Sequence, residues 1–257
     1  MNVLKVHRAI RAVAFSLVIL PSSVAIAQPA APATPATTRS QVTLVRVKPD
    51  MVNEWIDLQK NEVVPAQKKG GVTQRIVLQT TIGNSFEYAI ITPFPDFAAL
   101  DGQNATQKAL GTEAAARLAA KTRKCIDTQR TYLINQVTDL AIAPGTAPAV
   151  RTQVVHVAAG KQQDYLSYVR AEILPAMKKA KAAGKIAGYN VATRGVGSQA
   201  GEITTTTYYN KFADMDAGSP VVQMLGQAAA DAITAKGNAL ATPVQAIIRR
   251  RVADLSF

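Results

Sequence analysis

The sequence predicts an α+β protein in which two tandem βαββαβ repeats close into one pseudo-dimeric barrel. Residues 41–140 recur as residues 151–257, and each copy alternates strand and helix patterns around a central hairpin. One such unit covers a single sheet face with its helices, so two units are expected to bury their bare faces against each other. The matched landmarks are Trp55 with Tyr165, Glu62 with Glu172, Pro65 with Pro175 and, after a short insertion, Glu87 with Glu202, Lys121 with Lys236, and Leu140 with Leu255.

The elements of the first repeat follow from local patterns. Pro49-Asp50 suits a helix start, Gly70-Gly71 a helix end, and Gly83-Asn84 a hairpin turn. Pro65 predicts a kink near the end of the first helix. The expected elements are a strand over 42–47, a helix up to Lys69, strands over 73–81 and 86–92, a helix with a stripe of Leu110, Ala114 and Leu118, and a closing strand over 132–137.

The second repeat shows the same order of patterns. Gly184 marks the end of its first helix. The glycines of Gly195-x-Gly197-x-x-x-Gly201 join two strands, so they indicate a turn and no nucleotide loop. Its elements are a strand over 154–157, a helix with Tyr165, Tyr168 and Val169, strands over 189–193 and 203–209, a helix with Leu225, Ala229 and Ile233, and a closing strand over 247–252.

The first helices carry a recurring motif, Glu62-x-x-Pro65-Ala-x-Lys-Lys-Gly and again Glu172-x-x-Pro175-Ala-x-Lys-Lys. With the ferredoxin-like βαββαβ order, this motif resembles the dimeric α+β barrel superfamily, and within it NIPSNAP-type and antibiotic-biosynthesis-monooxygenase-like domains. The resemblance covers both repeats and implies the fold. The superfamily includes cofactor-independent monooxygenases, haem-degrading and haem-peroxidase enzymes, isomerases and members without an assigned activity. Function therefore has to be argued from the site.

Residues 1–27 have the pattern of a secretory signal peptide. Lys5, Arg8 and Arg11 precede a short apolar stretch, and Ala25-Ile26-Ala27 fits a cleavage site. We expect cleavage after Ala27 and a periplasmic or secreted protein without a membrane span. Two segments rich in Pro and Ala, 28–40 and 141–150, are expected to be linkers before and between the repeats 41–140 and 151–257.

The charge and the rare residues narrow the classes of function. Removing the signal peptide leaves a net charge of +9, which favours anionic ligands or surfaces. Nucleic-acid binding is not expected, because no strand combines aromatic and basic residues. Cys125 is the only cysteine, so the chain forms no internal disulfide, and its role stays open. The internal pseudo-dimer leaves further self-association open.

The candidate site lies between the two sheets. Val45, Val47, Val155 and Val157 are assigned to the helix-covered face, so Arg46 and its counterpart His156 are expected to point into the barrel. His156, the only histidine outside the signal peptide, is the candidate base, beside an arginine that binds an acidic ligand. The alternative is a histidine and an arginine at the barrel mouth, hydrogen-bonded to their neighbours.

Further candidate ligand-binding residues lie on polar strands of the second repeat. Tyr208 or Tyr209 faces the interior on either strand parity, together with a row of threonines. Arg249 and Arg251 share one face of the closing strand and would bind an anion if that face lines a cavity. The alternative is an edge strand protected by charge.

No cofactor is predicted. In the superfamily, haem enzymes take their iron ligand from a helix, whereas His156 is expected on a strand. A tyrosine could also bind the iron, so haem stays an alternative. One histidine and one cysteine cannot complete a zinc site. The sequence favours binding of a small anionic or aromatic ligand in the barrel. One alternative is a cofactor-independent monooxygenase-like oxidoreductase that acts on an aromatic molecule, with His156, Arg46 and a tyrosine as the residues that serve the reaction. The other is a basic module that contacts envelope surfaces.

Overall fold

The computed structural model describes residues 37–257, which form one compact unit. The predicted signal peptide and residues 28–36 of the predicted linker lie outside the described residues. The first repeat contains β1 (Thr37–Val47), η1 (Pro49–Met51), α1 (Val52–Leu58), η2 (Gln59–Val63), α2 (Val64–Lys69), β2 (Ile76–Ile82), β3 (Glu87–Pro93), η3 (Phe97–Leu100), α3 (Ala105–Leu110), α4 (Thr112–Lys124), β4 (Ile126–Val137) and η4 (Thr138–Leu140).

The second repeat has the same order of elements. It contains β5 (Ala149–Val157), α5 (Gln162–Tyr168), η5 (Val169–Ile173), α6 (Leu174–Ala182), β6 (Gly188–Arg194), β7 (Glu202–Tyr209), η6 (Phe212–Met215), α7 (Pro220–Leu225), α8 (Gln227–Asn238), β8 (Ala241–Arg251) and η7 (Ala253–Leu255). Strands β1 and β5 begin at Thr37 and Ala149, earlier than expected, so the ends of both predicted linker segments belong to strands. No helix of the described residues is long and apolar enough to span a membrane.

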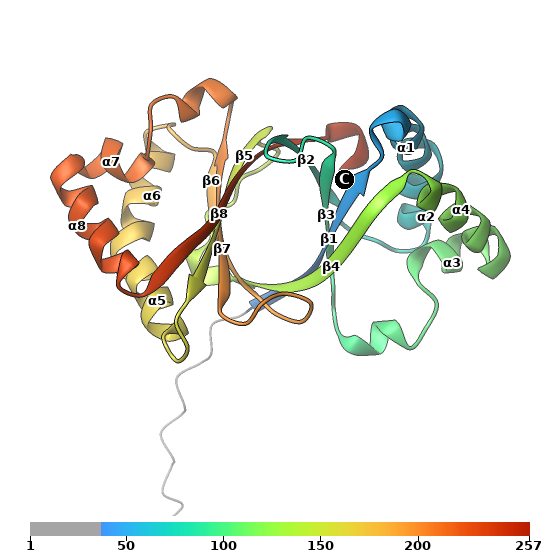
Figure 1. Cartoon of the computed structure of the whole chain (residues 1–257), viewed down its shortest axis with the longest axis horizontal. Coiled ribbons are helices and arrows are strands. Elements are labelled where there is room, and N and C mark those ends of the chain that lie inside the picture. Colours follow the sequence, from blue (N-terminus) through green and yellow to red (C-terminus); the bar gives the residue numbers. More distant parts are fainter. Residues whose placement is uncertain (1–36) are drawn as a thin grey trace, which may run out of the picture. The chain divides into compact units, whose positions relative to one another are not determined.

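The eight strands form one closed barrel in the order β1-β3-β2-β8-β5-β7-β6-β4. Each repeat contributes four neighbouring strands, and two antiparallel seams, β2 with β8 and β4 with β6, join the repeats. The helices lie outside the barrel, those of the first repeat on one side and those of the second on the other (Figure 1). The predicted fold, two βαββαβ repeats in one pseudo-dimeric barrel, is therefore confirmed.

Alternation along the strands separates two environments. Val45, Val47, Val155 and Val157 are buried under the helices, as predicted. The opposite face of the sheet points into the barrel, where Leu78, Ala89 and Val150 form a smaller apolar cluster. The helix-covered face thus holds the main cores, one in each repeat.

The first helix of each repeat contains one π-helical turn at the position where the sequence predicts a kink. The turns η2 and η5 end just before Val64-Pro65 and Leu174-Pro175. The amides of Val64 and Leu174 donate to the carbonyls five residues back. Proline has no amide proton to continue an i→i−4 ladder, so one wider turn lets each helix continue.

The second helix of each repeat breaks at a glycine. Gly111 and Gly226 have φ of 78° and 80° with ψ of 163°, a region that only glycine occupies readily. The break divides the predicted single helix into α3 and α4, and into α7 and α8. Of the predicted apolar stripe, Leu118 is buried, Ala114 is half-buried and Leu110 is 40% exposed, and Ala115 is buried as well.

The repeat landmarks form the same ion pair twice. Lys121 on α4 binds Glu62 on η2 at 3.1 Å, and Lys236 on α8 binds Glu172 on η5 at 2.5 Å. In each repeat the pair ties the first helical segment to the second. The exposed pairs add little stability, but they show that the two copies kept the same packing.

The final turns of the two repeats are exchanged. Leu255 of η7, at the end of the second repeat, is fully buried in the core of the first repeat. Leu140 of η4 is fully buried in the core of the second repeat. Beside them Lys60 binds Asp254 and Arg170 binds Asp139, both at 2.7 Å. Each repeat therefore completes the other repeat's core.

Candidate functional site

Arg46 and His156 lie on the strand parity that was predicted. Both belong to the face of the sheet that points into the barrel, but at strand ends where they are exposed. Arg46 forms an ion pair with Asp127, with Nε and Oδ2 3.4 Å apart. The ring of His156 lies against Gly201, so close that a Cβ added at this glycine would lie 3.3 Å from Cε1 of His156. Their roles in ligand binding stay predictions.

These two residues are not brought together. Tracing the registered strand pairs from Arg46 across β3, β2 and β8 leads to Val150 on β5. His156 lies six positions further along β5, but the path from His156 the other way, across β7, β6 and β4, leads to Ser40, six positions before Arg46. The two offsets are equal, so they come from the tilt of the strands in the barrel. Four antiparallel steps separate β1 from β5 in either direction, so the two strands run the same way and the pseudo-two-fold relation places Arg46 and His156 on opposite walls of the barrel.

Arg249 is already held by the protein. Its side chain is 7% exposed and donates to Glu87 at 3.0 Å and to Thr80 at 3.3 Å, across the seam between the repeats. Glu202, the counterpart of Glu87, is bound instead by Arg194 of its own repeat at 3.1 Å. The pair of Arg249 with Glu87 therefore bridges the seam between β2 and β8, and Arg249 is not an edge-strand charge.

Tyr208 and Arg251 do approach each other inside the barrel. Burial raises the pKa of the Tyr208 phenol, and a hydrogen bond from Asn190 and the positive charge of Arg251 oppose that rise. Tyr208 also packs against the inner apolar cluster. These residues match the predicted polar interior, although whether they bind a ligand stays a prediction.

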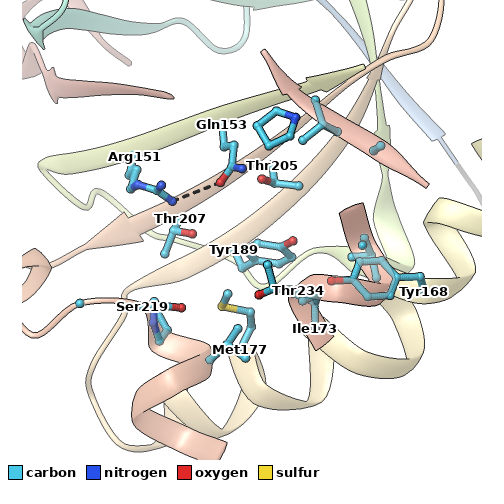
Figure 2. A pocket seen from close by; sticks show the side chains of 18 of the residues that line it. Arg151, Gln153, Tyr168, Ile173, Met177, Tyr189, Thr205, Thr207, Ser219 and Thr234 are labelled. Atoms are coloured by element: carbon cyan, nitrogen blue, oxygen red, sulfur yellow. Dashed lines mark hydrogen bonds between the residues drawn. The ribbon is translucent and has the colours of Figure 1, made fainter. Parts of the chain in front are cut away.

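Tyr209 faces the other way, into a cavity between the sheet and the helices of the second repeat. This second-repeat cavity has a volume of about 530 Å³. Its walls come from β5–β8 and from α5–α8, and Figure 2 shows side chains from the strands and from the helices pointing into it. Sequence reasoning considered only the space between the two sheets and missed this side of the wall.

The second-repeat cavity combines apolar and aromatic side chains with one polar wall. Arg151, Gln153, Thr205 and Thr207 stand on neighbouring strands, and Nη1 of Arg151 donates to Oε1 of Gln153 at 3.4 Å (Figure 2). The remaining lining includes Tyr165, Tyr168, Tyr189, Tyr209, Val169, Ile173, Met177 and Met215. Arg151 is the only charged side chain of this lining, and it forms no ion pair with any residue of 37–257.

The four tyrosines of the cavity are protonated at neutral pH. Burial raises the pKa of Tyr165 to about 12 and also raises those of Tyr168, Tyr189 and Tyr209. The positive charge of Arg151 partly opposes the rise at Tyr209, which places the guanidinium near that phenol. The Tyr168 hydroxyl donates to the carbonyl of Ile233 at 3.0 Å. The cavity therefore offers neutral phenols, hydroxyls and one guanidinium.

One signal in the sequence could have found this cavity. The threonine-rich strand β7 carries hydroxyls on both faces, and Thr205, Thr207 and Tyr209 lie on the helix-covered side. Arg151 stands where the first repeat has Gln41, a change from neutral to charged on the same face. Comparing the helix-covered faces of the two copies, as well as their inner faces, would have singled out Arg151.

The first repeat has a cavity in the equivalent place. This first-repeat cavity lies between the strands β1, β3 and β4 and the helical segments η2 and α2–α4, and it has a volume of about 1160 Å³. Among the residues that the structure describes, no group of three or more His, Cys, Asp or Glu is placed to hold a metal ion.

Comparison with known proteins shows similarity of structure. No protein-family model matches the chain, and no curated protein matches it. Solved structures do match over most of their lengths. A candidate monooxygenase from Lactobacillus acidophilus NCFM has a TM-score of 0.56 at 12% identity, covering 86% of this chain and 96% of its own. An anthrone oxidase-like protein has a TM-score of 0.58 at 12% identity, covering 84% and 91%.

A third match is a haem-binding protein from Thermus thermophilus, with a TM-score of 0.51 at 9% identity, covering 85% of this chain and 93% of that one. The chain has the dimeric α+β barrel fold. At such identities the likeness to other dimeric α+β barrels extends to the fold, and the side chains of each site decide the chemistry.

Haem ligation by histidine does not fit the second-repeat cavity of this dimeric α+β barrel. Within the described residues the cavity lining contains no histidine, and His156 belongs to the barrel-facing parity of β5. The raised pKa values of the tyrosines disfavour a phenolate ligand as well.

Proposed function

We propose that the protein binds a small molecule with an apolar or aromatic body and one anionic group in the second-repeat cavity. The volume of about 530 Å³ falls in the range usual for small-molecule sites. Four tyrosines and several aliphatic side chains suit a flat apolar body.

Arg151 is the observation that carries the proposal. A single guanidinium without a carboxylate partner in the described chain attracts a ligand carboxylate or phenolate, which it can bind through two parallel hydrogen bonds. Gln153, Thr205 and Thr207 can complete the hydrogen bonds of that anionic group.

Binding is favoured over catalysis by the lining itself. A monooxygenase-like enzyme that activates an aromatic substrate by deprotonation needs a base. The described lining of the cavity contains no His, Asp or Glu, and its tyrosines stay protonated at neutral pH. The similar fold of a candidate monooxygenase and of an anthrone oxidase-like protein supports oxidation of an aromatic molecule as the second candidate function. The proposed periplasmic or secreted location rests on residues 1–27.

The test compares 1-naphthoate with its neutral analogue 1-naphthamide by isothermal titration calorimetry. We expect naphthoate to bind more tightly, and Arg151→Gln, which installs the residue found at Gln41, to reduce naphthoate affinity about tenfold or more without changing naphthamide affinity. The control Arg130→Gln removes the same charge from a strand outside both cavities.

Equal affinities for the two probes, or equal losses in Arg151→Gln and Arg130→Gln, would reject the proposal. Equal losses in both variants, with affinity falling steeply as salt is added, would favour a basic surface that binds anions without a cavity. Oxygen consumption with anthrone as the substrate would instead favour the oxidase alternative.

A further inference from the structure

A buried arginine without an anionic partner lies in the first repeat. Arg75 is 1% exposed and directs its side chain toward the helices that cover the sheet. It forms no ion pair with any described residue, and its Nε has no hydrogen-bond partner there. Burial lowers the pKa of Arg75 to about 10, so the guanidinium is still charged at neutral pH. A buried charge of this kind is costly unless something compensates it.

Two glutamines contact this guanidinium and also line the first-repeat cavity. Nη1 of Arg75 donates to Oε1 of Gln67 at 2.5 Å, and Nη2 donates to Oε1 of Gln59 at 2.6 Å. An arginine can only donate hydrogen bonds, so these contacts fix which end of each amide faces Arg75. The Nε2 groups are left on the other side, and neither donates to a residue of the described chain.

The first-repeat cavity is positively charged as well as rich in polar groups. Lys108 and Arg123 line it, and neither forms an ion pair with a described residue. The one carboxylate of its lining, Asp127, is bound by Arg46. With Arg75 behind the two glutamines, the cavity has an excess of positive charge and of hydrogen-bond donors.

The polar residues of the lining, which stand beside apolar ones such as Phe94 and Leu100, suit hydroxyl groups. Threonine hydroxyls and asparagine or glutamine amides both donate and accept, as a polyhydroxylated ligand requires. Such residues on the cavity wall include Thr73, Thr92, Thr122, Gln41 and Asn104. The second repeat differs at the central position, because Tyr189 stands where strand alignment places Arg75. The duplicated cavities have therefore diverged in chemistry.

We propose that the first-repeat cavity is a second binding site, which takes a carboxylate that also carries several hydroxyl groups, as a sugar acid does. The Nε2 groups of Gln59 and Gln67 donate to the carboxylate, and Arg75 supplies the compensating positive charge from behind them. Charge–charge attraction is strong there because the guanidinium is shielded from water.

The test uses D-gluconate as the probe and sorbitol, which replaces the carboxylate by a hydroxymethyl group, as its neutral analogue. In protein labelled with ¹⁵N in glutamine side chains, gluconate is expected to shift the NH₂ resonances of Gln59 and Gln67, and sorbitol to bind at least about tenfold more weakly. Unmoved resonances, or equal affinities for the two probes, would overturn the proposal.

A variant separates binding from folding. Gln67→Glu places a carboxylate against Arg75, so it should keep or raise the melting temperature while lowering gluconate affinity about tenfold or more. The control Gln245→Glu adds the same charge on an exposed part of β8, outside both cavities. If the Gln67→Glu protein folds and keeps its gluconate affinity, the proposed site is refuted. If that variant does not fold, the shifts of the Gln59 and Gln67 resonances in the unmodified protein decide whether the site exists. Because Arg151→Gln should leave gluconate binding unchanged, failure of this site is distinguishable from failure of the second-repeat site.

Discussion

The exchanged final turns predict that a substitution at the end of the chain destabilises the first repeat. Leu255 is fully buried among Val47, Trp55 and Tyr88, which all belong to the other repeat. Replacing a fully buried leucine by alanine costs about 2–5 kcal/mol of unfolding free energy, through lost burial and the cavity left behind. For a protein of this size, that corresponds to a fall in melting temperature of about 4–20 °C.

Trp55 makes the effect measurable at the right place. It is the only tryptophan of the chain and lies 4.5 Å, centroid to centroid, from the ring of Tyr88 in the core that Leu255 completes. In urea unfolding followed by tryptophan fluorescence and by far-ultraviolet circular dichroism, Leu255→Ala should lower both midpoints together. Leu140→Ala, which creates the matching cavity in the second repeat, should do the same.

The control is Val196→Ala, at a side chain that is 67% exposed, where the change should stay within about 0.5 kcal/mol. The reasoning fails if Leu255→Ala behaves like this surface control. It also fails if Leu140→Ala lowers the circular-dichroism midpoint and leaves the Trp55 fluorescence midpoint unchanged, because the repeats would then unfold independently.

Three further predictions concern the barrel seam, the helix break and alkaline pH. Glu87→Gln leaves Arg249 buried without its ion pair and should cost about 3 kcal/mol in urea unfolding, whereas a loss below about 1 kcal/mol would show that the seam does not depend on the pair. Gly111→Ala should lower the free energy of unfolding by about 1–3 kcal/mol through backbone strain alone, because no atom lies within 4 Å of the added Cβ. The control Gly102→Ala is equally open but lacks a positive φ, so it should leave stability unchanged. Equal effects of the two substitutions would contradict the prediction. Burial raises the pKa of Tyr165 in the folded protein to about 12, so its contribution to stability is complete below about pH 10 and is lost as the pH rises to about 12. Absorbance at 295 nm should therefore show tyrosine ionisation coinciding with unfolding. Ionisation of Tyr165 in the folded protein would refute this prediction.

The repeat and its elements could be predicted from sequence because they depend on local patterns and on self-similarity. The alignment of Glu62 with Glu172 and of Lys121 with Lys236 identified both partners of an ion pair that the structure forms twice. Strand alternation also separated the helix-covered face from the barrel interior correctly, since valines dominate only one parity.

The site was harder to predict because it depends on relations between the repeats. Arg46 and His156 are equivalent in sequence, but the two-fold relation places them on opposite walls of the barrel, on strands with three others between them in either direction. The sequence shows that Leu140 aligns with Leu255, but it does not show that each leucine fills the core of the other repeat. No pattern in the neighbouring residues indicates which core receives the leucine. Arg75 lies just before a strand and shows no pattern of its own; its burial arises from two glutamines on a different element.

The exchange of the final turns also bears on the order in which the protein can mature during synthesis. The first repeat is translated well before Leu255, the leucine of the second repeat that fills its core. Until then the nascent half has an apolar hollow beside Trp55 that another chain's equivalent segment could occupy. Closing of this barrel on itself therefore requires the final turn of the second repeat, and translation of the first repeat alone does not suffice.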